Sequence, residues 1–429
     1  MIDRDPPSRA SSEAPRALLF AILPLLLLTA CRGRESSTKT FSAVDSAGVT
    51  IVESTHPLWE RGEGWTLSRE PEVVIGLREG DDRYLLNEVR GVRRLSDGRI
   101  AVLDAGSFRV RVYDSTGVHL TDLGGEGDGP SEFRTPQFLG LVFDTLFVYE
   151  AIGGNLTWFS PDGQLLRTSS GFSQTDTERE RGTLLMFGYL EDRFGAGVRT
   201  AGVRNRPLVE GLNREPWSIW RFDLFSSDAD SLFSVPGAEE MILSSGPEGT
   251  HHQTYVFGKY TVLTVSESCV YVAPTDEFSI QVFDRGGILR RIIRRNEAPR
   301  RVTRSDFHQW VEQQLELRDP PRDDIGEMRR TAGELSVAET MPAFRWIAVD
   351  SEDNLWVEEW KGVGLDQGRF SVFDPDGAWL GYVDIPDGLP ELRIAYDMQL
   401  MEIGSDYLLG VWIDEFGVEQ VRLHRIEKN

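Results

Sequence analysis

A short pattern of two β-strands joined by a glycine-containing turn recurs along this chain of 429 residues. Each copy has a strand with an aromatic residue near its end, then a polar residue, a tight turn and a second strand. The clearest copies are RVRVYDSTGVHL (109–120), NLTWFSPDGQLL (155–166), SIQVFDRGGILR (279–290) and RFSVFDPDGAWL (369–380). Glycine supplies the positive φ that tight hairpin turns require. The repeats therefore predict antiparallel β-hairpins and exclude a mainly helical fold.

A second hairpin precedes each clear copy, at 92–106, 139–151, 261–274 and 345–360. Two consecutive hairpins make a four-stranded unit of roughly 40 residues, which is the repeat length of β-propeller blades. Irregular copies at 186–235 and 400–426 bring the predicted number of blades to six. We therefore expect an all-β fold, a six-bladed β-propeller of four-stranded antiparallel blades over 43–429.

The last predicted blade lacks a fourth strand. The segment GVTIVES, 48–54, precedes the first full unit and could supply that strand. Pairing an N-terminal strand with the C-terminal blade would close the ring and remove an open sheet edge.

The glycine-rich stretch GGEGDGPSEFRTP, 124–136, resembles a nucleotide-binding loop only superficially. Pro130 stands where a dinucleotide-binding loop needs its third glycine, and the acidic Glu126 and Asp128 would repel a phosphate. The residues that follow are β-branched and aromatic, which indicates a strand and not a helix start. We therefore expect a connection between two neighbouring blades.

This stretch also carries a family resemblance. The pattern Gly127-x-Gly129-x-x-x-Phe133-x-x-Pro136, followed by LVFD, is similar to the start of an NHL repeat. The segment 102–114, VLDAGSFRVRVYD, resembles the second and third strands of the same repeat. The chain looks most like bacterial six-bladed β-propeller lipoproteins, and more distantly like TolB-like propellers. The resemblance implies that the glycines and the aspartate of each repeat are mainly structural.

The N-terminus predicts export and lipidation. Residues 17–28, ALLFAILPLLLL, are too few to span a bilayer but suit the core of a signal peptide. Leu28-Thr29-Ala30-Cys31 follows and resembles a bacterial lipobox, which implies a signal peptide over 1–30 and a lipid on Cys31. The polar residues 31–42 are expected to form a tether. Arg32 is not the aspartate of an inner-membrane retention signal, so we expect the outer membrane, facing the periplasm or the cell surface.

The formal net charge of −23 argues against a nucleic-acid partner, because binding phosphates requires a basic face. It also argues against attachment to anionic lipid through surface charge. The second of the two cysteines, Cys269, lies in a strand-like run and is expected to be a packed small residue.

A helical insertion is expected at 303–339, where the β pattern stops. Ser305 or Asp306 could cap a helix whose apolar stripe consists of Phe307, Trp310, Val311 and Leu315. Such an arm could be a lid, a partner surface or part of the packing.

The candidate site residues stand at the ends of the second strands of the blades. They are Asp104, Glu150, Arg199, Asp276, Glu358 and Asp414. A ring of carboxylates around a central channel could hold Ca²⁺, and calcium-dependent lactonases use such rings on six-bladed propellers. Alternatively, each carboxylate bonds backbone N–H groups in its own blade, as in NHL repeats. Trp360 and Trp412 follow strands toward loops and could line a binding face, or could belong to the core.

Two functions therefore remain open. The first is a lipid-anchored, non-catalytic binding or scaffold module for an envelope protein, peptide or glycan. The second is a calcium-dependent or other metal-dependent hydrolase that uses the channel carboxylates. The sequence has no HExxH, no cysteine-rich metal motif and no G-x-S-x-G elbow, which favours the binding module.

Overall fold

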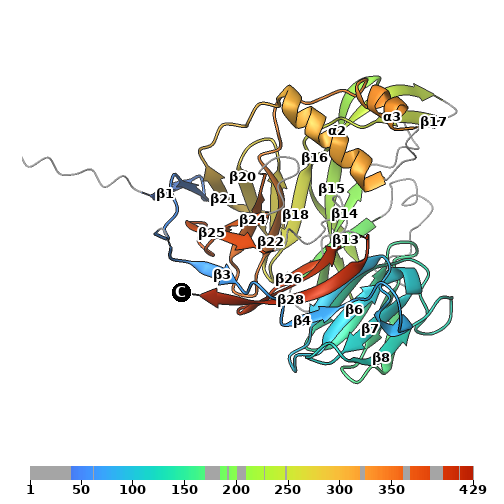
Figure 1. The fold of residues 1–429 in the computed structure, drawn as a ribbon. Helices are drawn as coiled ribbons and strands as arrows, with labels where there is room; N and C mark the ends of the chain where they lie inside the picture. The colour runs from blue at the N-terminus through green and yellow to red at the C-terminus, as the bar shows by residue number, and fades with distance from the viewer. Residues whose placement is uncertain are drawn as a thin grey trace, which may run out of the picture. The chain divides into compact units, whose positions relative to one another are not determined.

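β-Sheets make up most of the computed structural model of this chain (Figure 1). The structure describes residues 40–60, 62–169, 184–190, 193–200, 209–226, 228–246, 249–318, 324–360, 368–386, 400–414 and 416–428. The predicted signal peptide, 1–30, and the predicted lipid site at Cys31 lie outside the described residues. The first strand begins at Phe41, so the last two residues of the predicted tether belong to the folded body.

The described strands form six sheets. From β5 onward, consecutive strands fill one sheet after another, and β1 to β4 join the fourth and sixth sheets. The first contains β5 (Val89–Arg94), β6 (Ile100–Asp104), β7 (Arg109–Tyr113) and β8 (His119–Gly124). The second contains β9 (Pro136–Val142), β10 (Thr145–Glu150), β11 (Leu156–Phe159) and β12 (Leu165–Ser169). The third contains β13 (Leu184–Leu190), β14 (Phe194–Thr200), β15 (Gly211–Asp223), β16 (Ala229–Gly246) and β17 (Gly249–Gln253).

The other three sheets follow the same up-and-down order. The fourth contains β18 (Thr261–Val265), β19 (Cys269–Pro274), β20 (Ser279–Asp284) and β21 (Leu289–Arg295), extended by β2 (Val49–Ser54) and β1 (Phe41–Ser46). The fifth contains β22 (Phe344–Val349), β23 (Leu355–Glu359), β24 (Gly368–Phe373) and β25 (Trp379–Ile385). The sixth contains β26 (Met401–Ile403), β27 (Tyr407–Ile413) and β28 (Glu419–Lys428), with β3 (Trp65–Leu67) and β4 (Val73–Ile75). Short 3₁₀ turns lie at Asp82–Tyr84 and Ala105–Ser107.

Consecutive sheets pack against each other through their first strands. The strand β5 contacts β9, β9 contacts β13, β13 contacts β18, and β18 contacts β22. The fifth and sixth sheets meet through β25 and β3 and share one hydrophobic cluster. The strands β26 and β27 of the sixth sheet contact β5 of the first, so the succession returns to its start. This is the packing of a β-propeller.

The segment 48–54 was predicted to supply the missing strand of the last blade, and the structure shows a different closure of the ring. The strand β2, within that segment, pairs in parallel with β21 of the fourth sheet and not with the sixth. The strands β3 and β4 instead pair with β28, which is long enough for both. The prediction was wrong because β2 and β4 are both short β-branched strands, and local sequence does not say which open edge each one meets.

The segment between β2 and β3 runs across the fifth sheet. The amide of Leu58 donates to the carbonyl of Trp379 at 3.0 Å, and the amide of Trp59 donates to Leu380 at 2.7 Å. The Trp59 ring lies 5.4 Å from the Trp65 ring, which in turn lies 5.8 Å from Trp356 of β23. Residues 41–75, which we call the N-terminal strap, therefore contact the fourth, fifth and sixth sheets.

The glycine-rich stretch connects β8 to β9, as the sequence predicts. The ring of Phe133 is fully buried between the first two sheets, and its amide donates to the Gly125 carbonyl at 2.7 Å. The Gly129 amide donates to the Glu132 carboxylate at 2.7 Å, so a nearby acidic side chain occupies this amide. Gly124 has a φ of +93°, and a Cβ there would stand 2.2 Å from the Phe133 ring. The loop is thus shaped around a buried aromatic side chain.

The predicted helical insertion is present as α2 (Arg304–Arg318) and α3 (Ile325–Ala332), which lie together at the top of Figure 1. The cap residue is Thr303 and not Ser305 or Asp306. The Asp306 amide donates to Thr303 Oγ1 at 3.3 Å and the Thr303 amide donates to Asp306 Oδ2 at 2.8 Å, a reciprocal capping box. No helix of the described residues is long and apolar enough to cross a membrane.

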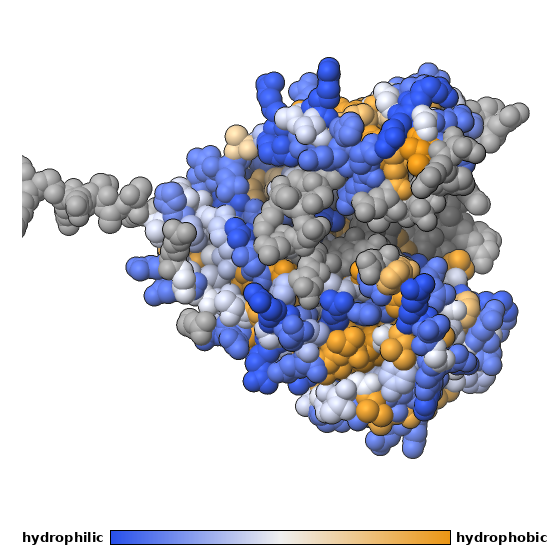
Figure 2. Space-filling model, viewed as in Figure 1, coloured by the Kyte–Doolittle hydropathy of each residue, from blue (hydrophilic) through white to orange (hydrophobic). Residues whose placement is uncertain are grey.

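The apolar stripe of α2 packs on the body of the protein. Val311 and Leu315 are buried, and Phe307 and Trp310 are half-buried. Phe307 and Trp310 pack against a cluster formed by Val256, Phe257, Ala338 and Met341. Of the three roles left open for the arm, packing is the one that these contacts show. Most of the coloured residues in Figure 2 are hydrophilic, and apolar groups gather in patches between them.

Candidate functional site

The predicted strand-end residues do not form one metal-binding group. Within the ranges that the structure describes, no three His, Cys, Asp or Glu side chains are placed to hold a metal ion together. Calcium needs several oxygen ligands at one point, so these residues do not fit a calcium ring. Their individual contacts show what most of them do.

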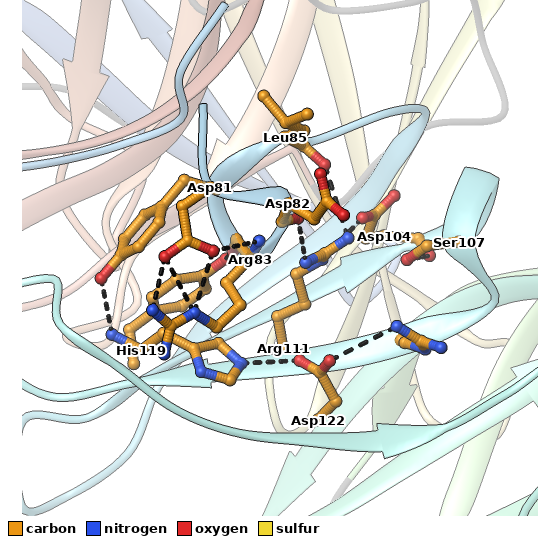
Figure 3. A network of polar contacts seen from close by, with 12 residues as sticks. Asp81, Asp82, Arg83, Leu85, Asp104, Ser107, Arg111, His119 and Asp122 are labelled. Carbon is orange, nitrogen blue, oxygen red and sulfur yellow. Dashed lines mark hydrogen bonds and ion pairs between the residues drawn. The ribbon is translucent and has the colours of Figure 1, made fainter. Parts of the chain in front are cut away.

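Asp104 clamps a neighbouring loop. Its carboxylate is fully buried and accepts a hydrogen bond from Arg111 Nε at 2.8 Å and one from the Asn87 amide at 3.2 Å. The Arg111 guanidinium also donates to the Asp82 carbonyl at 2.8 Å and to the Leu85 carbonyl at 3.4 Å. Figure 3 shows Arg111 between Asp104 and the segment that carries Asp82 and Leu85. The pair holds residues 82–87 onto the first sheet.

Glu150 and Asp276 are also held within their surroundings. Glu150 Oε1 accepts the amides of Arg134 at 2.7 Å and Thr135 at 3.1 Å, the structural role that the NHL resemblance implies. Arg214 binds Asp276 through two hydrogen bonds of 2.7 and 2.8 Å. Partial burial alone would raise the pKa of Asp276, but these bonds and the charge of Arg214 outweigh it and hold the pKa below its usual value.

Arg199 and Asp414 have local partners as well. The Arg199 guanidinium is buried over the Trp220 ring, 4.5 Å from its centre. Asp414 Oδ1 accepts the amides of Phe416 and Val418, each at 2.9 Å, and so shapes the turn between β27 and β28. Both residues thus have partners within their own blades.

Glu358 differs from the other predicted carboxylates. It is fully buried in β23, and neither of its oxygens accepts a hydrogen bond from the described residues. Its partner is Arg345 of β22, whose Nη1 lies 3.0 Å from Glu358 Oε1. This contact is an ion pair without the alignment of a hydrogen bond. Burial raises the pKa of Glu358 to about 7, although the charge of Arg345 opposes the rise.

The surroundings of Glu358 combine an exposed cation with aromatic side chains. The Arg345 side chain is 45% exposed, and its guanidinium lies 5.8 Å from the Trp360 ring. The Tyr260 hydroxyl donates to the Arg345 carbonyl at 2.9 Å. The buried indole N–H of Trp360 has no acceptor among the described residues, and its ring packs edge-on against Phe257. We call Tyr260, Arg345, Glu358 and Trp360 the Glu358 site.

The two predicted aromatic residues have different positions. Trp360 is half-buried beside the cluster that holds α2, within the Glu358 site. Trp412 is 2% exposed and lies in the core, 5.2 Å from the His424 ring. The prediction that Trp412 lines a binding face was therefore wrong, because β27 turns its indole inward. Sequence reasoning missed Arg345 and Tyr260, since neither belongs to a recognisable motif.

Comparisons with known proteins find only weak similarities. No family model matches the chain. The RING finger protein nhl-1 of Caenorhabditis elegans is 30% identical over 125 residues, which are 29% of this chain and only 13% of that protein. Among solved structures, a DUF4221 family member from Bacteroides vulgatus has 11% identity and a TM-score of 0.49, covering 86% of this chain and 99% of that one.

Two further structures have lower TM-scores. A protein named "Putative exported protein" from Bacteroides fragilis has 12% identity and a TM-score of 0.44, covering 88% of this chain and 99% of that one. Regucalcin, a calcium-binding protein from Agrobacterium tumefaciens, has 10% identity and a TM-score of 0.38, covering 85% and 96%. Similarities this weak carry no argument about function.

The sheet order and the packing of the sheets define this protein as a β-propeller. Within that class, the 125-residue similarity to the RING finger protein nhl-1 agrees with the NHL-type repeats that the sequence predicts.

Proposed function

We propose that this protein is a lipid-anchored β-propeller of six blades that binds a ligand at the bacterial cell envelope without chemical turnover. The six successive sheets, each contacting the next, support the blade number. The signal-peptide core and the lipobox-like residues ending at Cys31 support a lipid anchor in the outer membrane. The ligand is a protein, peptide or glycan of the envelope.

The observation that carries a binding role is the Glu358 site. Four of the five predicted carboxylates are bound by amides or by an arginine within the body, but Glu358 accepts no hydrogen bond from the described residues. Buried carboxylates without hydrogen bonds are costly and cluster at functional sites. The ionic partner of this buried group, Arg345, is 45% exposed, so a ligand can reach the guanidinium from solvent.

The alternative of a calcium- or other metal-dependent hydrolase has less support. Four of the predicted carboxylates have protein partners of their own: Asp104, Glu150, Asp276 and Asp414. In the described part of the chain, no three His, Cys, Asp or Glu side chains are placed to hold a metal ion together. A site of that kind would need these side chains to leave their partners first.

Two experiments test the proposal. Mass spectrometry of the mature chain should find a diacylglyceryl group on Cys31, and Cys31→Ser should abolish it and release the protein from membrane fractions. The mature protein in detergent should then be melted with envelope glycan fragments and with peptides, because a ligand of the folded state raises the melting temperature with dose. Failure of the whole panel to do so would refute the binding role. A dose-dependent rise with Ca²⁺ that is lost in Glu358→Gln would instead support the hydrolase.

A further inference from the structure

The Glu358 site has more hydrogen-bond donors than acceptors. The Arg345 guanidinium carries five N–H groups, and among the described residues its ionic partner is one Glu358 oxygen. The Trp360 indole N–H lies nearby without a described acceptor. A ligand that brings acceptors would satisfy the exposed guanidinium, and a carboxylate does so best because it can accept two parallel N–H groups of an arginine.

A second carboxylate at this site changes its charge balance. Arg345 and an ionised Glu358 together are neutral. A ligand carboxylate on Arg345 would leave one uncompensated negative charge, and Glu358, which is fully buried, would carry it without a hydrogen bond. An uncompensated buried charge is removed most cheaply by protonation.

We propose that Arg345 binds a carboxylate of the ligand and that Glu358 takes up one proton from solvent as the carboxylate binds. The proposal rests on the binding function proposed above and names its ligand chemistry. No covalent bond forms or breaks. The carboxylate replaces Glu358 as the ionic partner of Arg345, and the proton converts Glu358 into a neutral acid.

The groups around Glu358 are consistent with this exchange. Arg345 on β22 is the group whose charge acts on Glu358, and the strand partners of Glu358, Trp346 and Phe370, are uncharged. The other titratable neighbour is Tyr260, just before β18, whose own pKa responds to Glu358. Burial raises the pKa of Tyr260, so that phenol stays neutral. Burial also raises the pKa of Glu358 to about 7, so uptake of a proton by Glu358 is accessible near neutral pH.

The test uses small probes on the mature protein in detergent. N-Acetylphenylalanine represents a peptide end and is compared with its amide, and glucuronate represents an acidic sugar and is compared with glucose. Isothermal titration calorimetry in buffers of different ionisation enthalpy counts the protons taken up. The variants are Arg345→Gln and Glu358→Gln, with Arg369→Gln as control because Arg369 forms a surface ion pair with Asp384 on the same fifth sheet.

We expect at least one carboxylate probe to bind and its neutral partner not to bind. The affinity should fall about tenfold per pH unit above about pH 7, with about one proton taken up near pH 8. Arg345→Gln should weaken binding by about tenfold or more, Glu358→Gln should abolish the pH dependence, and Arg369→Gln should bind like the wild type. Should Arg345→Gln fail to fold, the pH profile of Glu358→Gln still tests the proposal.

Three results would overturn it: equal binding of acid and amide, a pH profile unchanged in Glu358→Gln, or full binding by a folded Arg345→Gln. If the envelope ligands of the wider panel bind Arg345→Gln as tightly as the wild type, the carboxylate proposal fails and the binding function stands. If no member of either panel binds, both fail.

Discussion

The buried pair of Asp104 and Arg111 should be a structural clamp whose removal destabilises the propeller. Asp104 is fully buried and the Arg111 side chain is 6% exposed. Asp104→Ala leaves the arginine charge with only carbonyl partners and leaves the Asn87 amide without its acceptor. Removing one member of a buried ion pair costs about 3–5 kcal/mol. We expect that loss in the free energy of unfolding.

A double-mutant cycle separates the clamp from simple loss of packing. Arg111→Met keeps the aliphatic bulk of the side chain and removes its charge. The double variant of Asp104→Ala and Arg111→Met has no buried charge left unpaired, so its loss should fall short of the sum of the single losses by about 2–3 kcal/mol. Urea denaturation followed by tryptophan fluorescence gives the free energy of each protein.

The control is Asp81→Asn, which removes the partner of Arg83 in the same polar network (Figure 3). Both side chains are well exposed, and an exposed ion pair contributes little, so this variant should unfold like the wild type. Strictly additive losses in the cycle, or a loss below about 1 kcal/mol for Asp104→Ala, would refute the clamp.

Three further variants test other parts of the structure. Glu358→Gln should raise the melting temperature above about pH 7 and leave it unchanged near pH 4. A buried carboxyl with a raised pKa stabilises the fold while it is protonated, and this contribution is lost as the carboxyl ionises. An equal shift in melting temperature at both pH values would contradict this. Thr303→Ala should cost about 1 kcal/mol of helix stability, seen as faster proteolysis of the arm, and unchanged cleavage would count against the capping box. Gly124→Ala should lower the melting temperature, since its Cβ would overlap the Phe133 ring at positive φ. The neighbouring Gly125→Ala has open space around its Cβ and should not, so equal effects would exclude the overlap.

The blade pattern was readable from the sequence because each hairpin repeats the same local chemistry. Asp114 and Asp284 each accept two backbone amides within their own turns, at Thr116 and Val118 and at Gly286 and Ile288. These bonds depend on residues two and four positions away, so a short segment contains all the information needed. The closing strands were not readable, because the partner of β2 lies more than 200 residues further along the chain.

The candidate site was harder to predict, because it too depends on contacts between residues that are not neighbours in the sequence. Asp104 and Glu358 both stand near the end of a second strand, and their sequence contexts do not separate a clamp from a candidate ligand site. Arg111 reaches Asp104 with an aligned hydrogen bond of 2.8 Å, whereas Arg345 reaches Glu358 at 3.0 Å without one. The distinction depends on side-chain direction and burial, and neither follows from residue type.

The N-terminal strap joins the proposed anchor to the fold. The tether enters β1, and β2 then pairs with β21, so a pull on the proposed lipid anchor acts first on the outer edge of the fourth sheet. The next contacts, at Trp379 and Leu380, lie on the fifth sheet, and β3 and β4 complete the sixth. A ring closed by one strand pair opens when that pair breaks. Here the strap has two further attachments before its closing strands β3 and β4. One is the pairing of β2 with β21, and the other is the pair of hydrogen bonds to Trp379 and Leu380, so a pulling force acts on three sheets. The fifth sheet carries Arg345 and Glu358, and Tyr260 stands directly before β18 of the fourth, so the strap contacts the two sheets that border the candidate ligand site.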